Sequence, residues 1–201
     1  MNNVTYHNPV KVVFGLGTLK QAGEETAKLG KRALVVSYGD ASVSGTLAKL
    51  KERLDAAGVA SQEFLEVVPN PPIEMVARGV EAAKAFGADL VVGVGGGSAM
   101  DAAKAIAAGV LYTHGDLWNM VYASHSNVTA QPPEQALPLL LIPTLPATGS
   151  EMNMCSVVSS TTCGKKSYIW ADCLFAKTAV RSVGRRETGR QTQRVLYADA
   201  E

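Results

Sequence analysis

The residues with the clearest chemical potential are three consecutive glycines and a serine, Gly95-Gly96-Gly97-Ser98. They follow a short β-branched apolar run and precede strong helix formers, so the order predicts a strand, a tight turn and a helix. The N–H groups and positive dipole end of a helix start bind anions such as phosphates. Glycines allow close backbone approach, and Ser98 suits an N-cap. A purely structural turn fits the glycines as well, and the spacing is not the Gly-x-Gly-x-x-Gly dinucleotide fingerprint.

Polar or glycine-rich turns follow two other predicted strands in the same way. They are Tyr38-Gly39-Asp40 and the segment from Thr144 through Thr148 to Ser150, and Asn70 follows a further strand. In a parallel sheet the carboxyl ends of the strands share one edge, where α/β proteins bind ligands. We therefore expect one cleft, in which the outer turns hold sugar or nicotinamide groups and the glycine turn holds a pyrophosphate.

Alternating strands and helices are predicted to position these turns. Strands are expected over 10–14, 33–36, 64–68, from 89 into the glycine turn, and 137–143; helices over 18–29, 45–57, 73–86 and from the glycine turn to 108; and a hairpin from 154–159 and 166–170. This alternation predicts an α/β fold with a parallel, doubly wound sheet and right-handed crossovers.

Length, charge and cysteine content narrow the class of protein. A chain of 201 residues with 47% hydrophobic and 18% charged residues suits one α/β domain. The net charge of +1 offers no basis for nucleic-acid or anionic-membrane binding. An odd number of cysteines without C-x-x-C spacing argues against a disulfide scaffold. We see no signal-peptide layout or bilayer-spanning run, and expect a cytoplasmic protein without nucleic-acid or membrane partners.

Three segments together resemble a known family. They are Pro69-Asn70-Pro71, the run from Gly95 through Asp101 to Lys104, and Leu145-Pro146-Ala147-Thr148-Gly149-Ser150-Glu151. All are similar to motifs of the iron-containing (group III) alcohol dehydrogenases, in particular the branch of butanol dehydrogenases and NADPH-dependent aldehyde reductases. The resemblance runs from about residue 8 to residue 180. It implies a Rossmann-like dinucleotide-binding domain over residues 1–180, which an all-helical metal domain follows in the family.

The same resemblance implies roles for the polar residues of the expected cleft. Pyrophosphate would be held by Gly95, Gly96, Gly97 and Ser98, and the rest of the cofactor cleft would be lined by Asn70, Asp101, Thr144 and Thr148. Family members that prefer NAD tend to carry Asp at the end of the second strand. This chain has Tyr38-Gly39 there, which leaves room for the 2′-phosphate of NADP, while neighbouring Asp40 keeps NAD open.

The resemblance stops after residue 180. Family members continue with an apolar residue and Asp-Pro, then helices in which one Asp and three His bind a divalent metal such as iron or zinc. Here 181–201 holds five of the eight arginines without a clear period, so we expect a basic tail that is disordered or weakly packed. His7, His114 and His125 are too far apart in sequence to form a paired metal motif. We therefore expect the metal domain and its ligands to be absent, as in a truncated or frameshifted copy.

Two functions from different classes follow from the sequence. In the first, the chain is the cofactor-binding half of an NAD(P)-dependent oxidoreductase that interconverts small alcohols and aldehydes by hydride transfer. In the second, it is a non-catalytic dinucleotide-binding or pseudo-enzyme fragment. No residue is assigned as catalytic or as a metal ligand, and a homodimer is one option for its assembly.

Overall fold

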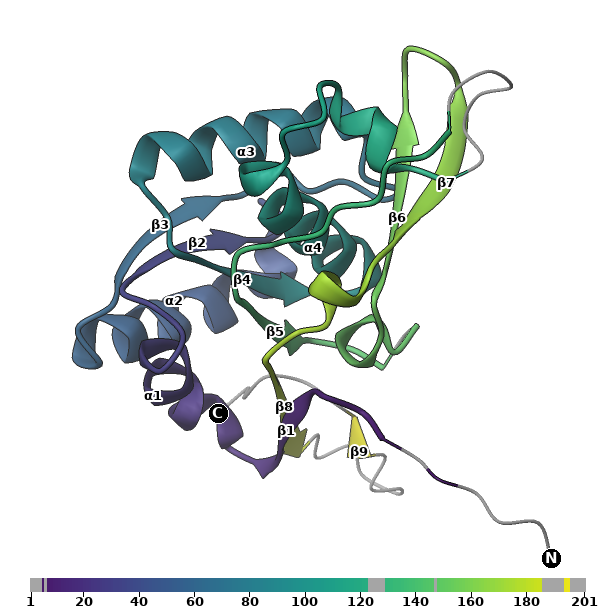
Figure 1. Ribbon diagram of the computed structural model, residues 1–201. Helices are drawn as coiled ribbons and strands as arrows, with labels where there is room; N and C mark the ends of the chain where they lie inside the picture. Colours follow the sequence, from purple (N-terminus) through teal and green to yellow (C-terminus); the bar gives the residue numbers. More distant parts are fainter. Residues whose placement is uncertain (1–4, 6, 123–128, 147, 186–193, 196–201) are drawn as a thin grey trace, which may run out of the picture.

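The computed structural model describes residues 5, 7–122, 129–146, 148–185 and 194–195 as a central sheet flanked by helices (Figure 1). Six parallel strands lie in the order β1-β8-β5-β4-β2-β3, and β9 pairs antiparallel with β8. The strands are β1 (Lys11–Leu16), β2 (Arg32–Val36), β3 (Ala60–Phe64), β4 (Leu90–Gly95), β5 (Leu139–Pro143), β8 (Thr178–Arg185) and β9 (Arg194–Val195). The predicted α/β class is confirmed. In this described part, none of the helices has both the length and the hydropathy that a membrane crossing requires.

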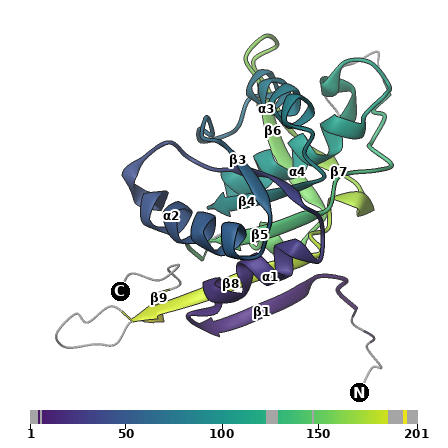
Figure 2. The ribbon, with the colours of Figure 1, turned by 90° about the vertical axis from the view of Figure 1, so that its left-hand side faces the viewer.

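Helices cover both faces of the sheet, which explains why its central strands are apolar throughout. In β2, Leu34 and Val36 pack into the core on one face, and Ala33 and Val35 into the core on the other. Figure 2 shows α1 and α2 on one side of the sheet and α3 and α4 on the opposite side. The helices are α1 (Ala22–Ala27), α2 (Ala41–Ala56), α3 (Ile73–Phe86) and α4 (Gly97–Leu111), with short 3-10 helices η1 (Thr18–Gln21), η2 (Leu117–Met120), η3 (Ser150–Met152) and η4 (Asp172–Leu174).

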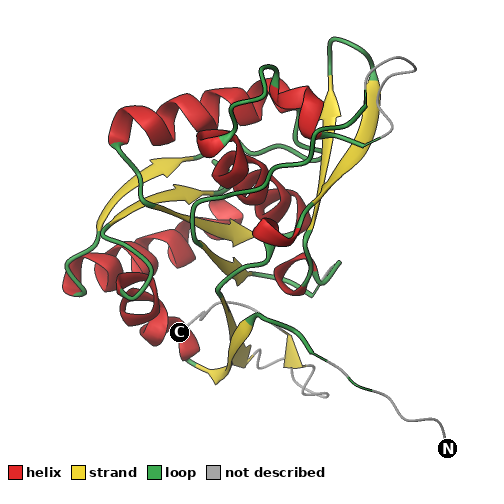
Figure 3. Cartoon of the chain, viewed as in Figure 1, coloured by secondary structure: helices red, strands yellow, loops and turns green. Residues whose placement is uncertain are grey.

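An antiparallel hairpin of β6 (Cys155–Ser160) and β7 (Lys165–Trp170) stands beside α3 and α4 (Figure 3). Glu74, in the first turn of α3, accepts hydrogen bonds from the backbone N–H groups of Thr161 and Thr162 at 3.1 and 3.2 Å. Burial opposes ionisation of this carboxyl, but hydrogen bonds from its own N–H and from both threonines lower the pKa of Glu74 to about 2. An ionised Glu74 thus anchors the hairpin turn to the start of α3.

Two predicted elements begin at other residues than expected, for different physical reasons. The strand expected over 64–68 lies instead at Ala60–Phe64, where it pairs with β2. Because this strand has exposed positions, it accommodates polar residues, so the apolar residues of 64–68 did not mark its place. The helix expected from residue 45 begins at Ala41. Asp40 caps it, because its carboxylate accepts a hydrogen bond from the Ser42 N–H at 2.9 Å.

Strand β8 crosses the boundary expected at residue 180. It pairs in parallel with β1, from Lys11 opposite Thr178 to Leu16 opposite Val183. Ser182 is buried within this pairing. The first residues of the segment 181–201, which was expected to be disordered or weakly packed, therefore form part of a strand. The arginine-rich composition of the segment gave no indication of this strand. The rest of that expected tail, except Arg194–Val195, lies outside the described residues.

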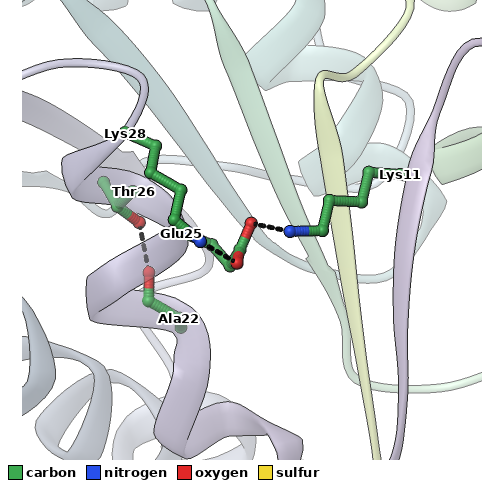
Figure 4. Close-up of polar contacts among 5 residues, drawn as sticks. All are labelled: Lys11, Ala22, Glu25, Thr26 and Lys28. Atoms are coloured by element: carbon green, nitrogen blue, oxygen red, sulfur yellow. Dashed lines mark hydrogen bonds and ion pairs between the residues drawn. The ribbon is translucent and has the colours of Figure 1, made fainter.

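Ion pairs connect the edge strand β1 to helix α1 (Figure 4). The Glu25 carboxylate, with only 8% of its side chain exposed, lies 2.6 Å from Nζ of Lys11 and 2.5 Å from Nζ of Lys28. The Thr26 hydroxyl donates to the Ala22 carbonyl at 2.6 Å within the same helix. Hydrogen bonds from Lys11 and Lys28 lower the pKa of Glu25 despite its burial. One carboxylate thus holds two segments together.

We expect Glu25→Gln to lower the free energy of unfolding by about 1–2 kcal/mol at pH 7, because two lysines lose their shared anionic partner. The folded pKa of Glu25 lies below the unfolded value of 4.5, so its contribution is present above that pH and is lost as the pH falls through the folded pKa. Urea unfolding between pH 7 and pH 2 should show the two proteins converging in acid. Glu24→Gln, at an exposed neighbouring position, is the matched control; an equal loss there would contradict the prediction.

Candidate functional site

The turn between β4 and α4 contains glycines for two different reasons. Gly95 has a φ of 139°, and a Cβ there would lie 2.8 Å from both the Ala99 Cβ and the Tyr38 ring. Backbone conformation and packing therefore both require glycine at 95. Gly96 has a φ of −84°, and a Cβ there would meet the Tyr38 hydroxyl at 3.6 Å and Leu145 at 3.7 Å, which are ordinary contacts. Neither the backbone conformation nor the Cβ contacts therefore require glycine at 96.

Helix α4 begins at this turn without a side-chain cap. Its N-cap is Gly96 in an extended conformation, and the carbonyl of Gly96 accepts the N–H groups of Ala99 and Met100, each at 3.1 Å. Ser98, expected as the N-cap, is instead the second residue of the helix, so that prediction is wrong. The positive end of this 15-residue helix thus faces the carboxyl edge of the sheet, and its N-cap residue supplies no side-chain hydrogen bond.

Three of the predicted cleft residues gather around the glycine turn. The Tyr38 ring lies against Gly95, and the Thr144 N–H donates to the Gly95 carbonyl at 3.0 Å. The Thr148 hydroxyl lies 3.1 Å from the position that a Cβ of Gly97 would occupy. Tyr38 follows β2, the glycine turn follows β4 and both threonines follow β5, so parallel pairing of these neighbouring strands brings them together. Their contact with a cofactor stays a prediction.

The turn after β2 presents exposed backbone at Gly39 and an exposed carboxylate at Asp40. A Cβ at Gly39 would lie 2.8 Å from the Leu65 carbonyl oxygen, which explains the glycine by packing. Both the hydroxyl and the backbone N–H of Ser42 donate to Asp40, and these bonds lower the pKa of Asp40. Asp40 therefore serves as the cap of α2.

Asn70 lies between β3 and α3 in the left-handed region, with a φ of 54°. Its side-chain oxygen accepts a hydrogen bond from Lys166 Nζ at 2.6 Å, and its carbonyl accepts one from the Ser159 hydroxyl at 2.7 Å. The hairpin thus brings a cation, Lys166, to one of the predicted cofactor residues. The sequence did not predict this contact between Lys166 and Asn70, because the two residues are 96 positions apart.

Asp101 belongs to a buried polar cluster on the first turns of α4. Its Oδ1 accepts a hydrogen bond from the Ser150 hydroxyl at 2.7 Å. Burial raises the pKa of Asp101, against the opposing effects of Ser150 and of the charges of Lys104 and Lys166. Lys104, one turn further on, is fully buried and had no predicted role. It is the residue of this region that sequence reasoning missed.

No three His, Cys, Asp or Glu side chains come together as a metal site within the described ranges. Of the three histidines considered, His125 falls outside those ranges. Glu151 is buried, and its carboxylate lies 3.4 Å from the Arg181 guanidinium in β8. This ion pair gives Glu151 a structural partner in the segment where the family resemblance ends.

Comparison with known proteins agrees with this geometry. The sequence model described as iron-containing alcohol dehydrogenase matches residues 9–182. The probable NADH-dependent butanol dehydrogenase 1 of Bacillus subtilis (strain 168) is 41% identical over 183 residues, which cover 90% of this chain and 45% of that protein. The NADPH-dependent aldehyde reductase YqhD of Escherichia coli (strain K12) is 33% identical, over 83% of this chain and 41% of that protein.

Solved structures share the same fold. The NADH-dependent butanol dehydrogenase A from Thermotoga maritima superposes with a TM-score of 0.79 and 36% sequence identity, over 90% of this chain and 44% of that chain. This chain therefore spans about half the length of the relatives it matches. The matched region contains the parallel strands up to residue 182, the glycine turn and the hairpin, and the resemblance noted in the sequence is confirmed. The chain belongs to the iron-containing alcohol dehydrogenase family.

Proposed function

We propose that this chain binds an NAD(P) dinucleotide at the carboxyl edge of its sheet, as the cofactor-binding half of an alcohol–aldehyde oxidoreductase. The observation that carries the proposal is the uncapped start of α4 at Gly96, a position that packing does not reserve for glycine. A pyrophosphate there would meet the first N–H groups of the helix and its positive dipole end. Gly95, Gly96, Gly97 and Ser98 would surround it.

The remaining cleft residues suit the other parts of a dinucleotide. Thr144 and Thr148 offer hydroxyls beside the turn, and Asn70 and Asp101 offer an amide and a carboxyl on the side of the hairpin. A bound nicotinamide supplies the hydride, while the protein orients it. The names of the relatives, butanol dehydrogenase and aldehyde reductase, support small alcohols and aldehydes as the substrate class.

For the choice of cofactor, we propose NADP over NAD. This choice is supported by the neutral Tyr38-Gly39 directly after β2, since an acidic residue there would repel a 2′-phosphate, and by the role of Asp40 as a helix cap. Relatives of both kinds exist, since the B. subtilis protein is described as NADH-dependent and the E. coli protein as NADPH-dependent.

Titration of the purified chain by nicotinamide fluorescence tests both proposals. NADPH should bind more tightly than NADH, because the neutral Tyr38-Gly39 follows β2 and the Asp40 carboxylate is bonded to Ser42. Equal affinities, or tighter binding of NADH, would overturn the NADP preference and give Asp40 the ribose-binding role. Failure to bind either dinucleotide would overturn the site itself.

Gly96→Val should abolish dinucleotide binding and leave a folded protein, because the side chain fits the backbone but fills the space that a phosphate needs. Gly95→Ala is the contrasting variant and should unfold more easily by about 1–3 kcal/mol, since its φ of 139° is strained for alanine. Circular dichroism and thermal unfolding would separate the two effects. A Gly96→Val protein with unchanged affinity would mean that the turn is structural.

A dinucleotide-binding protein without turnover is the second candidate function. It is favoured by the lack of a His, Cys, Asp or Glu cluster in the described part of a chain whose family is iron-containing. In the family, as the resemblance implies, one Asp and three His hold a divalent metal. Such a metal acts as a Lewis acid on the substrate oxygen.

We expect the purified chain to reduce butanal with NADPH at close to the background rate, with or without added iron or zinc. Losing a Lewis acid removes several kcal/mol of transition-state stabilisation, which corresponds to roughly a thousandfold or more in rate. Elemental analysis and absorbance at the nicotinamide band are the measurements, with a full-length relative as positive control. One tightly bound metal per chain with metal-dependent turnover would favour the complete oxidoreductase instead.

A further inference from the structure

The amine of Lys104 lies between helix α4 and the segment that joins β5 to β6, and the residue is 0% exposed. Building on the proposed dinucleotide site, we propose that Lys104 is a positioning residue for the cofactor. Its ammonium group fixes the 148–155 segment against α4, so that Thr148 and Asp101 stand beside the glycine turn.

Five oxygen atoms lie within hydrogen-bonding distance of Lys104 Nζ. Three are the backbone carbonyl oxygens of Ser150 at 2.6 Å, Asn153 at 2.8 Å and Cys155 at 2.8 Å. The other two are the Ser150 hydroxyl at 3.1 Å and the Asn153 side-chain oxygen at 3.0 Å. All five belong to one short segment, whereas the amine comes from the middle of α4. A single side chain therefore sets where this segment lies relative to the helix.

Two short links carry this placement to the glycine turn. The Ser150 hydroxyl donates to Asp101 Oδ1 at 2.7 Å, and Asp101 lies one turn before Lys104 on α4. Thr148 precedes Ser150 by two residues, and its hydroxyl lies 3.1 Å from the position of a Cβ at Gly97. Displacing the segment would move Thr148 away from the turn and remove the hydroxyl donor of Asp101.

The charge of Lys104 matters because an ammonium donates three hydrogens, whereas a neutral amine donates two. Burial lowers the pKa of Lys104 to about 8, against the opposing charges of Asp101 on α4, Cys155 on β6 and Glu151 on η3. Lys166 on β7 acts on the same cluster by lowering the pKa of Asp101. Deprotonation of Lys104 therefore removes one donor from the 148–155 segment within an accessible pH range.

The test is NADPH titration of wild type and Lys104→Met at pH 7 and pH 9. The 2′-phosphate gains a little negative charge between these pH values, since its second pKa is about 6, and this change is the same for both proteins. Methionine keeps a similar length without donors, so we expect affinity about tenfold weaker at pH 7, as for unsatisfied buried partners. Wild type should bind more weakly at pH 9 than at pH 7, and Lys104→Met should not depend on pH. A residue that only fills space would not produce this difference.

Two further variants make the outcome decisive. Lys84→Met, at an exposed position of α3, is the matched control and should keep wild-type affinity and pH dependence. Ser150→Ala breaks the link to Asp101 but retains the backbone carbonyls, so it should weaken binding and keep the pH dependence.

Each result decides between defined alternatives. A folded Lys104→Met protein with wild-type affinity, or with wild-type pH dependence, overturns the positioning role and leaves the dinucleotide site intact. If Lys104→Met does not fold, Ser150→Ala decides, and wild-type affinity there overturns the role. A wild-type chain that binds no dinucleotide at pH 7 overturns the proposed function together with this inference.

Discussion

Parallel pairing of β4 with β2 on one side and β5 on the other is the constraint on which the candidate site depends. Because the three strands run in the same direction, the turns that follow them meet at one edge of the sheet. Tyr38, Gly96 and Thr144 are distant in sequence, yet they share this edge. The helices on both faces keep these strands buried, so the pairing that creates the site is also the core of the fold.

The polar cluster behind the glycine turn has a different energetic character from the core. At neutral pH the depressed pKa of Lys104 means that its charged form is less favourable in the folded chain than in the unfolded chain. A buried ammonium is therefore a poor source of global stability. What it contributes is the position of the 148–155 segment, because five oxygen acceptors of that segment lie around one amine of α4. This accords with a role in placing Thr148 and Asp101 rather than in holding the domain together.

Much of the fold was predictable because the strongest signals are local. Helix α3 begins at Ile73 and ends before Gly87 as expected, since its apolar spacing and C-terminal glycine are unambiguous. The edge strand β3 was misplaced because exposed edge positions do not need apolar residues. The cleft residues around Gly95 follow from strand order, whereas the contacts of Lys104 and Lys166 join segments far apart in sequence. Such long-range contacts produce no repeating pattern of residue types from which the sequence could predict them.

The pairing of β1 with β8 has a consequence for how the chain is made. Lys11 emerges from the ribosome early, but its partner Thr178 is among the last described residues to be synthesised. During that interval β1 has no neighbouring strand, and Val12, Phe14 and Leu16, which remain exposed in the folded protein, stay in water. Strand β1 therefore cannot pair with β8 until β8 has been synthesised, and a ribosome that pauses within the β8 codons would leave an apolar β segment available to chaperones.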